Sequence, residues 1–158
     1  MTDEAGMQLA LAQAERGLAA GEPPFGVVII APDGTVVAAG FDTVRTARDW
    51  TYHAEIETVR AACRSYGPDL TGCTLFTTVE PCPMCFTSAW LARISRLVFG
   101  ATMVEVDQVT DGQQRELDIP AGHINGMSPA PLELIGGVLR KDCVALFHRH
   151  GAVIHPGA

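Results

Sequence analysis

The sequence lacks long apolar runs and has few basic residues. Its longest apolar stretch, Phe25–Ala31, is far shorter than the roughly 20 residues that cross a membrane. Eleven Lys and Arg stand against 18 Asp and Glu, so the net charge is −7. An isoelectric point near 5.1 argues against a surface that follows a nucleic-acid backbone. The acidic start, Thr2–Gly6, does not resemble a signal peptide. We therefore expect a cytoplasmic protein with neither a membrane nor a nucleic acid as its partner.

Cysteine is also scarce, with five residues. The odd count and the missing export signal indicate a reducing compartment rather than a disulfide scaffold. Charged residues at 18% and hydrophobic residues at 47% exclude a disordered chain. A chain of 158 residues can bury a core and fits one domain. We expect a single domain over residues 1–158, because no repeat or linker interrupts the sequence.

Hydrophobic periodicity divides the chain into helices and strands. The expected helices are Asp3–Ala20, His53–Ser65, Pro83–Ala92 and Arg140–His148. The expected strands are Phe25–Ala31, Thr35–Gly40, Cys73–Thr77, Leu97–Phe99 (with Ile94 before it) and Leu132–Ile135. Residues 42–51 are expected to form a loop, and residues 101–127, which show no clear pattern, a long loop over the site. This order predicts an α/β fold: a three-layer α/β/α sandwich around a five-stranded mixed sheet.

Three potential metal ligands lie at the starts of two expected helices. Cys82 and Cys85 are three residues apart, so both sulfurs project from one side of a first turn, and His53 opens the preceding helix. The positive end of a helix dipole favours thiolate over thiol. One imidazole and two thiolates suit Zn²⁺, and three protein ligands leave a position for water, as in catalytic zinc sites. We expect one zinc per chain. The alternative is a closed structural site whose fourth ligand is one of Cys63, Cys73, Cys143, His123 and His148.

Glu55 stands two residues after the candidate histidine ligand. Zinc lowers the pKa of bound water, and a neighbouring carboxylate can accept that proton and return it later. Carboxylate is a poorer zinc ligand than thiolate in this set, so Glu55 is interpreted as the catalytic proton shuttle.

In order and separation, these residues match the His-x-Glu…Pro-Cys-x-x-Cys signature of zinc-dependent nucleobase deaminases. The chain resembles the cytidine-deaminase-like superfamily, in the branch that holds guanine deaminases, fungal-type cytosine deaminases and tRNA adenosine deaminases. The resemblance runs from about Met7 to about Phe147. The segments that carry it are Pro24–Gly26, Thr51–Glu55, Glu80–Cys85, Arg93–Ile94, Val98–Ala101, Gly137–Leu139 and Cys143. It implies hydrolysis at the amino-bearing carbon of a small aminated heterocycle, release of ammonia, and a homodimer.

Several positions near the motif are candidates for substrate binding. The family usually has Asn eleven residues before the metal histidine, and here that position holds Asp42. An acceptor-only side chain suits a substrate with two neighbouring N–H donors, as in guanine, although Asp42 could also only shape a turn. Trp50 and Tyr52 replace smaller family residues and could wall the base pocket, or only pack. The resemblance further implies Phe25 and Ala54 at the pocket.

The leading hypothesis is a hydrolytic deaminase of a nucleobase, nucleoside or related heterocycle, with a guanine-like purine base favoured. The second hypothesis is a tRNA adenosine deaminase. Two features argue against it: Thr102-Met103 stands where these enzymes usually have an Arg-Asp pair, and the chain lacks a long basic closing helix. A zinc-stabilised interaction module without activity is the third, and intact Glu55 argues against it. Glu105 and Asp107 are further candidates for contacting an amino group.

Overall fold

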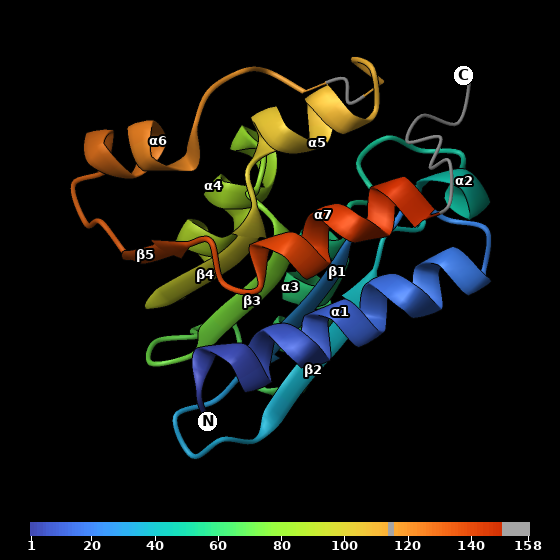
Figure 1. Ribbon diagram of the computed structural model, residues 1–158. Coiled ribbons are helices and arrows are strands. Elements are labelled where there is room, and N and C mark those ends of the chain that lie inside the picture. The colour runs from blue at the N-terminus through green and yellow to red at the C-terminus, as the bar shows by residue number, and fades with distance from the viewer. Residues whose placement is uncertain (114–115, 150–158) are drawn as a thin grey trace.

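The computed structural model describes residues 1–113 and 116–149, and it is built on one five-stranded sheet in the order β2-β1-β3-β4-β5 (Figure 1). The strands are β1 (Gly26–Ile30), β2 (Val36–Phe41), β3 (Thr74–Val79), β4 (Arg96–Ala101) and β5 (Glu133–Gly136). β1 is antiparallel to both β2 and β3, whereas β3, β4 and β5 are parallel. The sheet is therefore mixed, as the sequence predicts.

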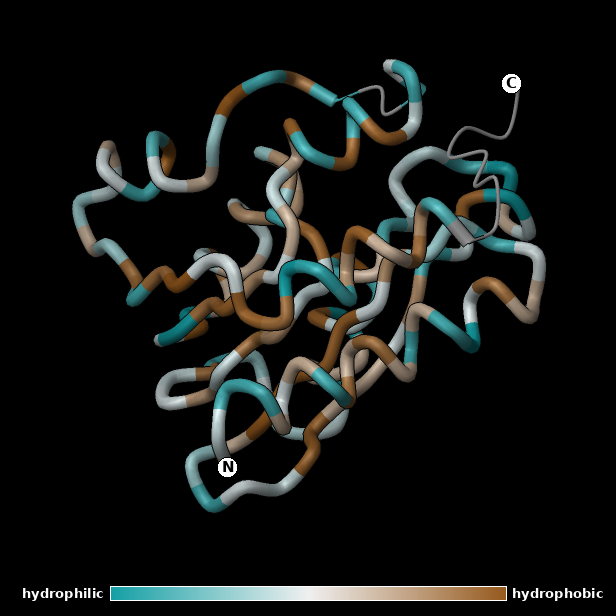
Figure 2. Tube along the Cα trace, viewed as in Figure 1, coloured by the Kyte–Doolittle hydropathy of each residue, from teal (hydrophilic) through white to brown (hydrophobic). Residues whose placement is uncertain are grey.

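Helices cover both faces of this sheet. They are α1 (Asp3–Ala19), α2 (Val44–Ala47), α3 (Ala54–Ser65), α4 (Pro83–Leu91), α5 (Met103–Val109), α6 (Ala121–Met127) and α7 (Arg140–Arg149). Figure 1 shows α1 and α7 in front of the strands, with α3 and α4 behind them. Every residue of β1 is buried, because a central strand covered on both faces has no polar side. In Figure 2 the brown, hydrophobic centre of the trace marks the strands of the sheet. The predicted three-layer α/β/α architecture is confirmed.

Gly26, at the start of β1, permits the closest approach between the sheet and α1. A Cβ at this position would lie 2.1 Å from the carbonyl oxygen of Ala10 and 2.4 Å from the amide nitrogen of Ala14. Both neighbours are helix backbone and cannot turn aside. The Gly26 N–H donates to Thr78 Oγ1 at 3.1 Å, so the strand end beside the site is also tied to β3.

The loops expected at residues 42–51 and 101–127 are wrong in part, because each holds short helices. α2 lies in the first, and α5 and α6 lie in the second. α5 begins with a capping box, in which Thr102 Oγ1 accepts from the Glu105 amide and the Glu105 carboxyl accepts from the Thr102 amide. None of the described helices is long and apolar enough to cross a membrane.

Candidate active site

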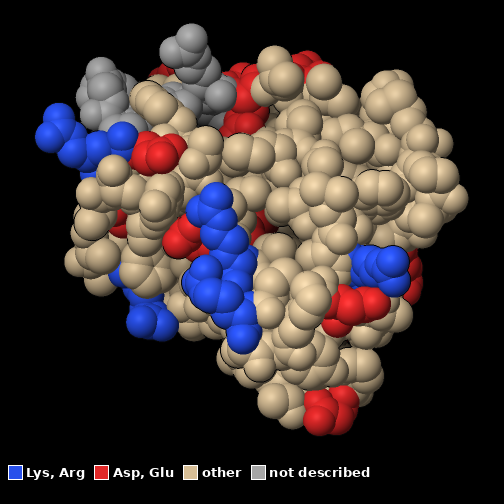
Figure 3. All heavy atoms as spheres, turned by 180° about the vertical axis from the view of Figure 1, so that it is seen from behind, with Lys and Arg blue, Asp and Glu red and all other residues tan. Residues whose placement is uncertain are grey.

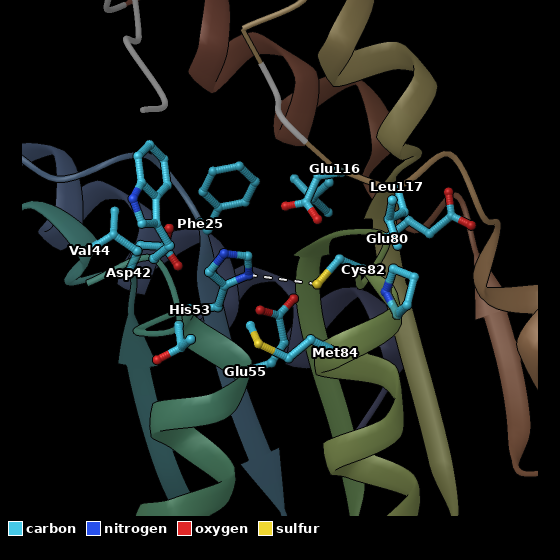
Figure 4. Close-up of a pocket in the computed structure, with 14 residues that line it drawn as sticks. Phe25, Asp42, Val44, His53, Glu55, Glu80, Cys82, Met84, Glu116 and Leu117 are labelled. Atoms are coloured by element: carbon cyan, nitrogen blue, oxygen red, sulfur yellow. Dashed lines mark hydrogen bonds between the residues drawn. The ribbon is translucent and has the colours of Figure 1, made fainter. Parts of the chain in front are cut away.

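The candidate metal ligands meet where α3 and α4 begin, at one edge of the sheet (Figure 4). His53 is the N-cap residue of α3 and Cys82 the N-cap residue of α4, with Pro83 in the first position of that helix. Pro suits this position because its missing N–H would have no helical partner there. Cys85 follows in the first turn of α4 and is buried. Two helix N-termini therefore present one imidazole and two sulfurs to the same point.

The spacing of these three ligand atoms fits zinc. His53 Nδ1 lies 3.4 Å from Cys85 Sγ and 3.8 Å from Cys82 Sγ. Ordinary Zn–N and Zn–S bonds in a tetrahedral site put such atoms about 3.5–3.8 Å apart. Within the described part of the chain, no fourth His, Cys, Asp or Glu joins this group. The structure thus positions His53, Cys82 and Cys85 as a possible zinc site and adds none of the other described cysteines and histidines to it, so the three-ligand arrangement stays our prediction for how the zinc is held.

Without a metal, these ligands share protons among themselves. Hydrogen bonding to Cys85 lowers the pKa of Cys82 to about 4, against the effect of burial and with further help from His53. Burial opposes the charged imidazole of His53, but the Cys82 hydrogen bond and the nearby Asp42 and Glu55 raise its pKa to about 10. Burial raises the pKa of Cys85. A metal ion would replace these protons, because only the deprotonated ligands coordinate.

Glu55 is buried beside the ligands and is 6% exposed. Its Oε1 accepts a hydrogen bond of 2.9 Å from Thr77 Oγ1 on β3. In Figure 4 its carboxyl group points up between His53 and Cys82. Burial raises the pKa of this carboxyl, and a nearby Zn²⁺ would act in the opposite sense. A carboxyl under two such opposing influences is suited to exchanging a proton near neutral pH.

Asp42 reaches the same pocket from the end of β2. Its Oδ1 accepts the N–H of Ala54, the first residue of α3, at 2.7 Å. No other hydrogen bond to its carboxyl is found among the described residues, and Figure 4 shows this group at the pocket wall. Burial raises the pKa of Asp42 to about 8, although the nearby His53 opposes this. A nearby Zn²⁺ would act in the same sense as His53 and favour the ionised carboxylate, which only accepts hydrogen bonds. Asp42 therefore fixes the start of α3 and still has one oxygen for a ligand.

The structure brings most, but not all, of the predicted site residues together. Phe25, Asp42, Trp50, His53, Glu55 and Cys82 all line one cavity of about 310 Å³. Tyr52 and Ala54 are not among its lining residues. The Arg60 guanidinium lies 5.9 Å from the centre of the Tyr52 ring, and the Ala54 N–H is occupied by Asp42. Substrate contact by these two residues stays a prediction.

Glu116 also lines this cavity, and no sequence motif indicated it as a site residue. It lies between α5 and α6, and in Figure 4 its carboxyl group is turned toward the space above His53 and Cys82. Burial and the neighbouring Cys82 raise its pKa to about 8. Glu105, selected from the sequence, instead takes part in the capping box and pairs with Arg140. Asp107 lines an adjacent cavity together with Glu116.

Comparison with known proteins places the chain among deaminases and related tRNA enzymes. The guanine deaminase of Bacillus subtilis is 35% identical over 126 residues, which cover 77% of this chain and 80% of that protein. The tRNA-specific adenosine deaminase of Agrobacterium fabrum is 42% identical over 96 residues, 60% of this chain and 62% of that protein. The tRNA(Ile)-lysidine synthase of Deinococcus deserti is 45% identical over 94 residues, 59% of this chain but 18% of the synthase. The chain thus spans less than two thirds of the length of some of its curated relatives.

Solved structures give the same picture. The guanine deaminase of Nitrosomonas europaea superposes with a TM-score of 0.81 at 25% identity, covering 95% of this chain and 85% of that one. A protein in complex with 8-azaguanine gives 0.85 at 27% identity, covering 96% and 85%. A deaminase for A-to-I editing at the wobble position of transfer RNA gives 0.75 at 28% identity, covering 90% and 98%. The family model described as "Cytidine and deoxycytidylate deaminase zinc-binding region" matches residues 1–101, and the chain therefore belongs to this family.

Proposed function

We propose that the chain is a zinc-dependent hydrolytic deaminase that releases ammonia from a free, guanine-like purine base. The observation that carries this proposal is the pair of carboxyl groups, Asp42 and Glu116, that line one cavity together with the shuttle candidate Glu55 and the metal ligands His53 and Cys82. The cavity of about 310 Å³ lies at the small end of the range for small-molecule sites.

His53, Cys82 and Cys85 would hold the zinc, which supplies Lewis-acid chemistry that acidifies water. Glu55 accepts the proton of the attacking water and then delivers protons to the ring nitrogen and the leaving amine. The Thr77 hydroxyl orients it by donating to Oε1. Since Glu55 is buried, few water molecules compete for these protons.

Asp42 and Glu116 would select the base through its N–H donors. Guanine carries a ring N–H directly beside the amino group that leaves, so a carboxyl oxygen can accept from both. Bases with a ring acceptor at this position would place it against an acceptor, which leaves buried groups unpaired. Phe25 offers an aromatic ring at the same wall of the cavity, where a base can stack.

The relatives support this choice of substrate. One is a guanine deaminase from Bacillus subtilis that the chain matches over most of its length. A similar solved structure holds 8-azaguanine. On the face shown in Figure 3, basic side chains form a narrow central strip and several separate smaller groups, most with acidic groups close by. On this face they do not join into the broad basic surface typical of nucleic-acid binding.

Deamination of adenosine in tRNA is the second candidate, favoured by the 42% identity to the Agrobacterium tRNA-specific adenosine deaminase. The experiment is an ammonia-release assay of the zinc-loaded protein with guanine, other nucleobases, nucleosides and tRNA. We expect turnover of guanine and none of tRNA adenosine. Glu55→Gln should be inactive, whereas Glu57→Gln, in the first turn of the same helix and paired with Arg60, should keep wild-type rates. Inosine formation in tRNA, or zinc binding with no ammonia from any compound, would overturn the proposal.

A further inference from the structure

Glu80 uses both of its carboxyl oxygens to hold the first residues of two different helices. Oε2 accepts the N–H of Met103, where α5 begins, at 3.1 Å. Oε1 accepts the N–H of Ala121, where α6 begins, at 2.9 Å. The side chain is 9% exposed. Glu80 lines the cavity of the candidate site, but in Figure 4 its carboxyl group points away from His53 and Glu55. Both of its oxygens are taken by helix N–H groups, so we assign it no contact with the reacting atoms.

Neither helix satisfies its first N–H by itself. The N-cap residue of α6 is Pro120, which makes no side-chain cap hydrogen bond. The N-cap residue of α5, Thr102, bonds the Glu105 amide and leaves that of Met103 to another partner. Buried N–H groups need an acceptor, and Glu80 supplies it for both helices.

These helices flank the chain segment that brings Glu116 to the pocket. Glu116 precedes the anchored Ala121 by five residues, a chain length that spans at most about 18 Å. Residues 116–118 and α5 line a common cavity of about 280 Å³. Holding the starts of α5 and α6 therefore restricts where the carboxyl group of Glu116 can lie.

Glu80 is also rigidly connected to the metal site. Its own N–H donates to the Ala101 carbonyl at the end of β4 at 2.8 Å, and it precedes the ligand Cys82 by two residues. We propose that Glu80 is a positioning residue that fixes Glu116 relative to Cys82 and so sets the affinity for the base. The proposal rests on the deaminase function proposed above.

Glu80→Gln tests this with little change in shape. The amide has one acceptor oxygen, so one of the two helix N–H groups loses its partner and faces an NH₂ group. We expect unchanged zinc content, kcat within about threefold of wild type, and a KM for guanine about tenfold higher, roughly 1.4 kcal/mol. Amide exchange should rise in α5 or α6 and stay unchanged in α3 and α4. Thr2→Ala, which removes the N-cap hydrogen bond of α1, is the control for a distant helix cap and should keep the wild-type KM.

A double-mutant cycle with Glu116→Gln identifies the route of the effect. If Glu80 acts through Glu116, Glu80→Gln should change KM at least fivefold less in the Glu116→Gln background. Equal effects in both backgrounds, or faster exchange with wild-type KM, would show that Glu80 only stabilises the fold. Should Glu80→Gln not fold, Glu80→Asp takes its place in the cycle. Amide exchange can be measured without a substrate. Unchanged exchange in α5 and α6 of Glu80→Gln refutes the positioning role of Glu80, even if the protein turns over no base. Faster exchange in these helices together with a lack of turnover by the wild type refutes the proposed deaminase function alone.

Discussion

Asp42→Asn separates the helix-capping role of Asp42, which the structure shows, from the substrate-binding role that we propose for the same carboxyl group. Oδ1 accepts the Ala54 N–H at 2.7 Å, and the Asn side chain can keep that bond with its carbonyl oxygen. The amide nitrogen then replaces the oxygen available to the pocket, so an acceptor becomes a donor. If Asp42 accepts N–H groups of the substrate, the variant opposes donor to donor while α3 remains capped.

The size of the effect follows from the burial of this group. An unpaired polar group in a site excluded from water costs about 1–3 kcal/mol, which corresponds to about 5- to 150-fold in kcat/KM. Guanine, which has an N–H beside its reacting amine, should bear this loss, and cytosine, which has a ring acceptor there, should not. We expect the ratio of their kcat/KM values to shift by at least about fivefold toward cytosine, with zinc content unchanged.

Asp42→Ala is the matched variant, because it removes the helix cap as well. Loss of a cap costs about 1 kcal/mol and should lower the melting temperature by about 2–4 °C, whereas Asp42→Asn should melt as wild type does. An equal loss of kcat/KM on guanine and cytosine in Asp42→Asn would refute the substrate-binding role and leave Asp42 with a role only in shaping its loop. An unchanged ratio and unchanged rates would place it outside the site.

The remaining predictions concern the shuttle, two features of the fold and the assembly. Glu55→Gln should keep one zinc per chain by metal analysis and lose at least about 10²–10⁴-fold in ammonia release; a wild-type rate would assign the shuttle elsewhere. Arg96 binds both carboxyl oxygens of Asp3 at 2.6 and 2.8 Å and lowers its pKa below 3.8, so Asp3→Asn should cost about 1 kcal/mol at pH 7. Because a carboxyl whose pKa is lowered by folding stabilises fully only above its unfolded value, urea titrations should show this difference shrink as the pH falls below 3.8 and vanish below the lower pKa of the folded state. Gly26→Ala should cost about 3 kcal/mol or more in the same titrations, since its Cβ would lie 2.1 Å from the Ala10 carbonyl oxygen; a smaller cost would mean that α1 can shift. Light scattering should give the mass of a homodimer, and a monomer would contradict this expectation of the family resemblance.

The sheet and its long helices were predictable because their signals are periodic. Four helices and five strands were expected close to their observed bounds, since long helical periodicities and short runs of apolar, β-branched residues both report on burial. α2, with four residues, and α6, with two glycines among its seven, are too short to show a helical pattern. α5 carried a signal that could have been used: Thr102 and Glu105 have the spacing of a capping box.

The candidate site likewise holds residues that could be predicted from the sequence and residues that could not. Short, fixed spacings near helix starts identify the first kind, which are His53, Glu55, Cys82 and Cys85. Glu116 has no neighbour in the sequence that indicates its role, because it meets the pocket through the tertiary placement of α5 and α6. Glu80 directly precedes the metal-ligand motif, and the sequence alone indicates no role for it. Its two partners lie 23 and 41 residues away, and no local pattern could have paired them.

The order of the functional groups along the chain has a consequence for engineering and for evolution. All three candidate metal ligands and Glu55 lie before residue 101, where the family match ends, whereas Glu116 lies after it. The proposed catalytic residues and one of the proposed substrate-binding residues are therefore encoded in separate stretches of the chain. Exchanging residues 116–120 between relatives, with Glu80 and Ala121 retained as fixed ends, should change the preferred heterocycle without rebuilding the catalytic centre. A lineage could acquire new substrates by the same route, through mutations that leave zinc binding untouched.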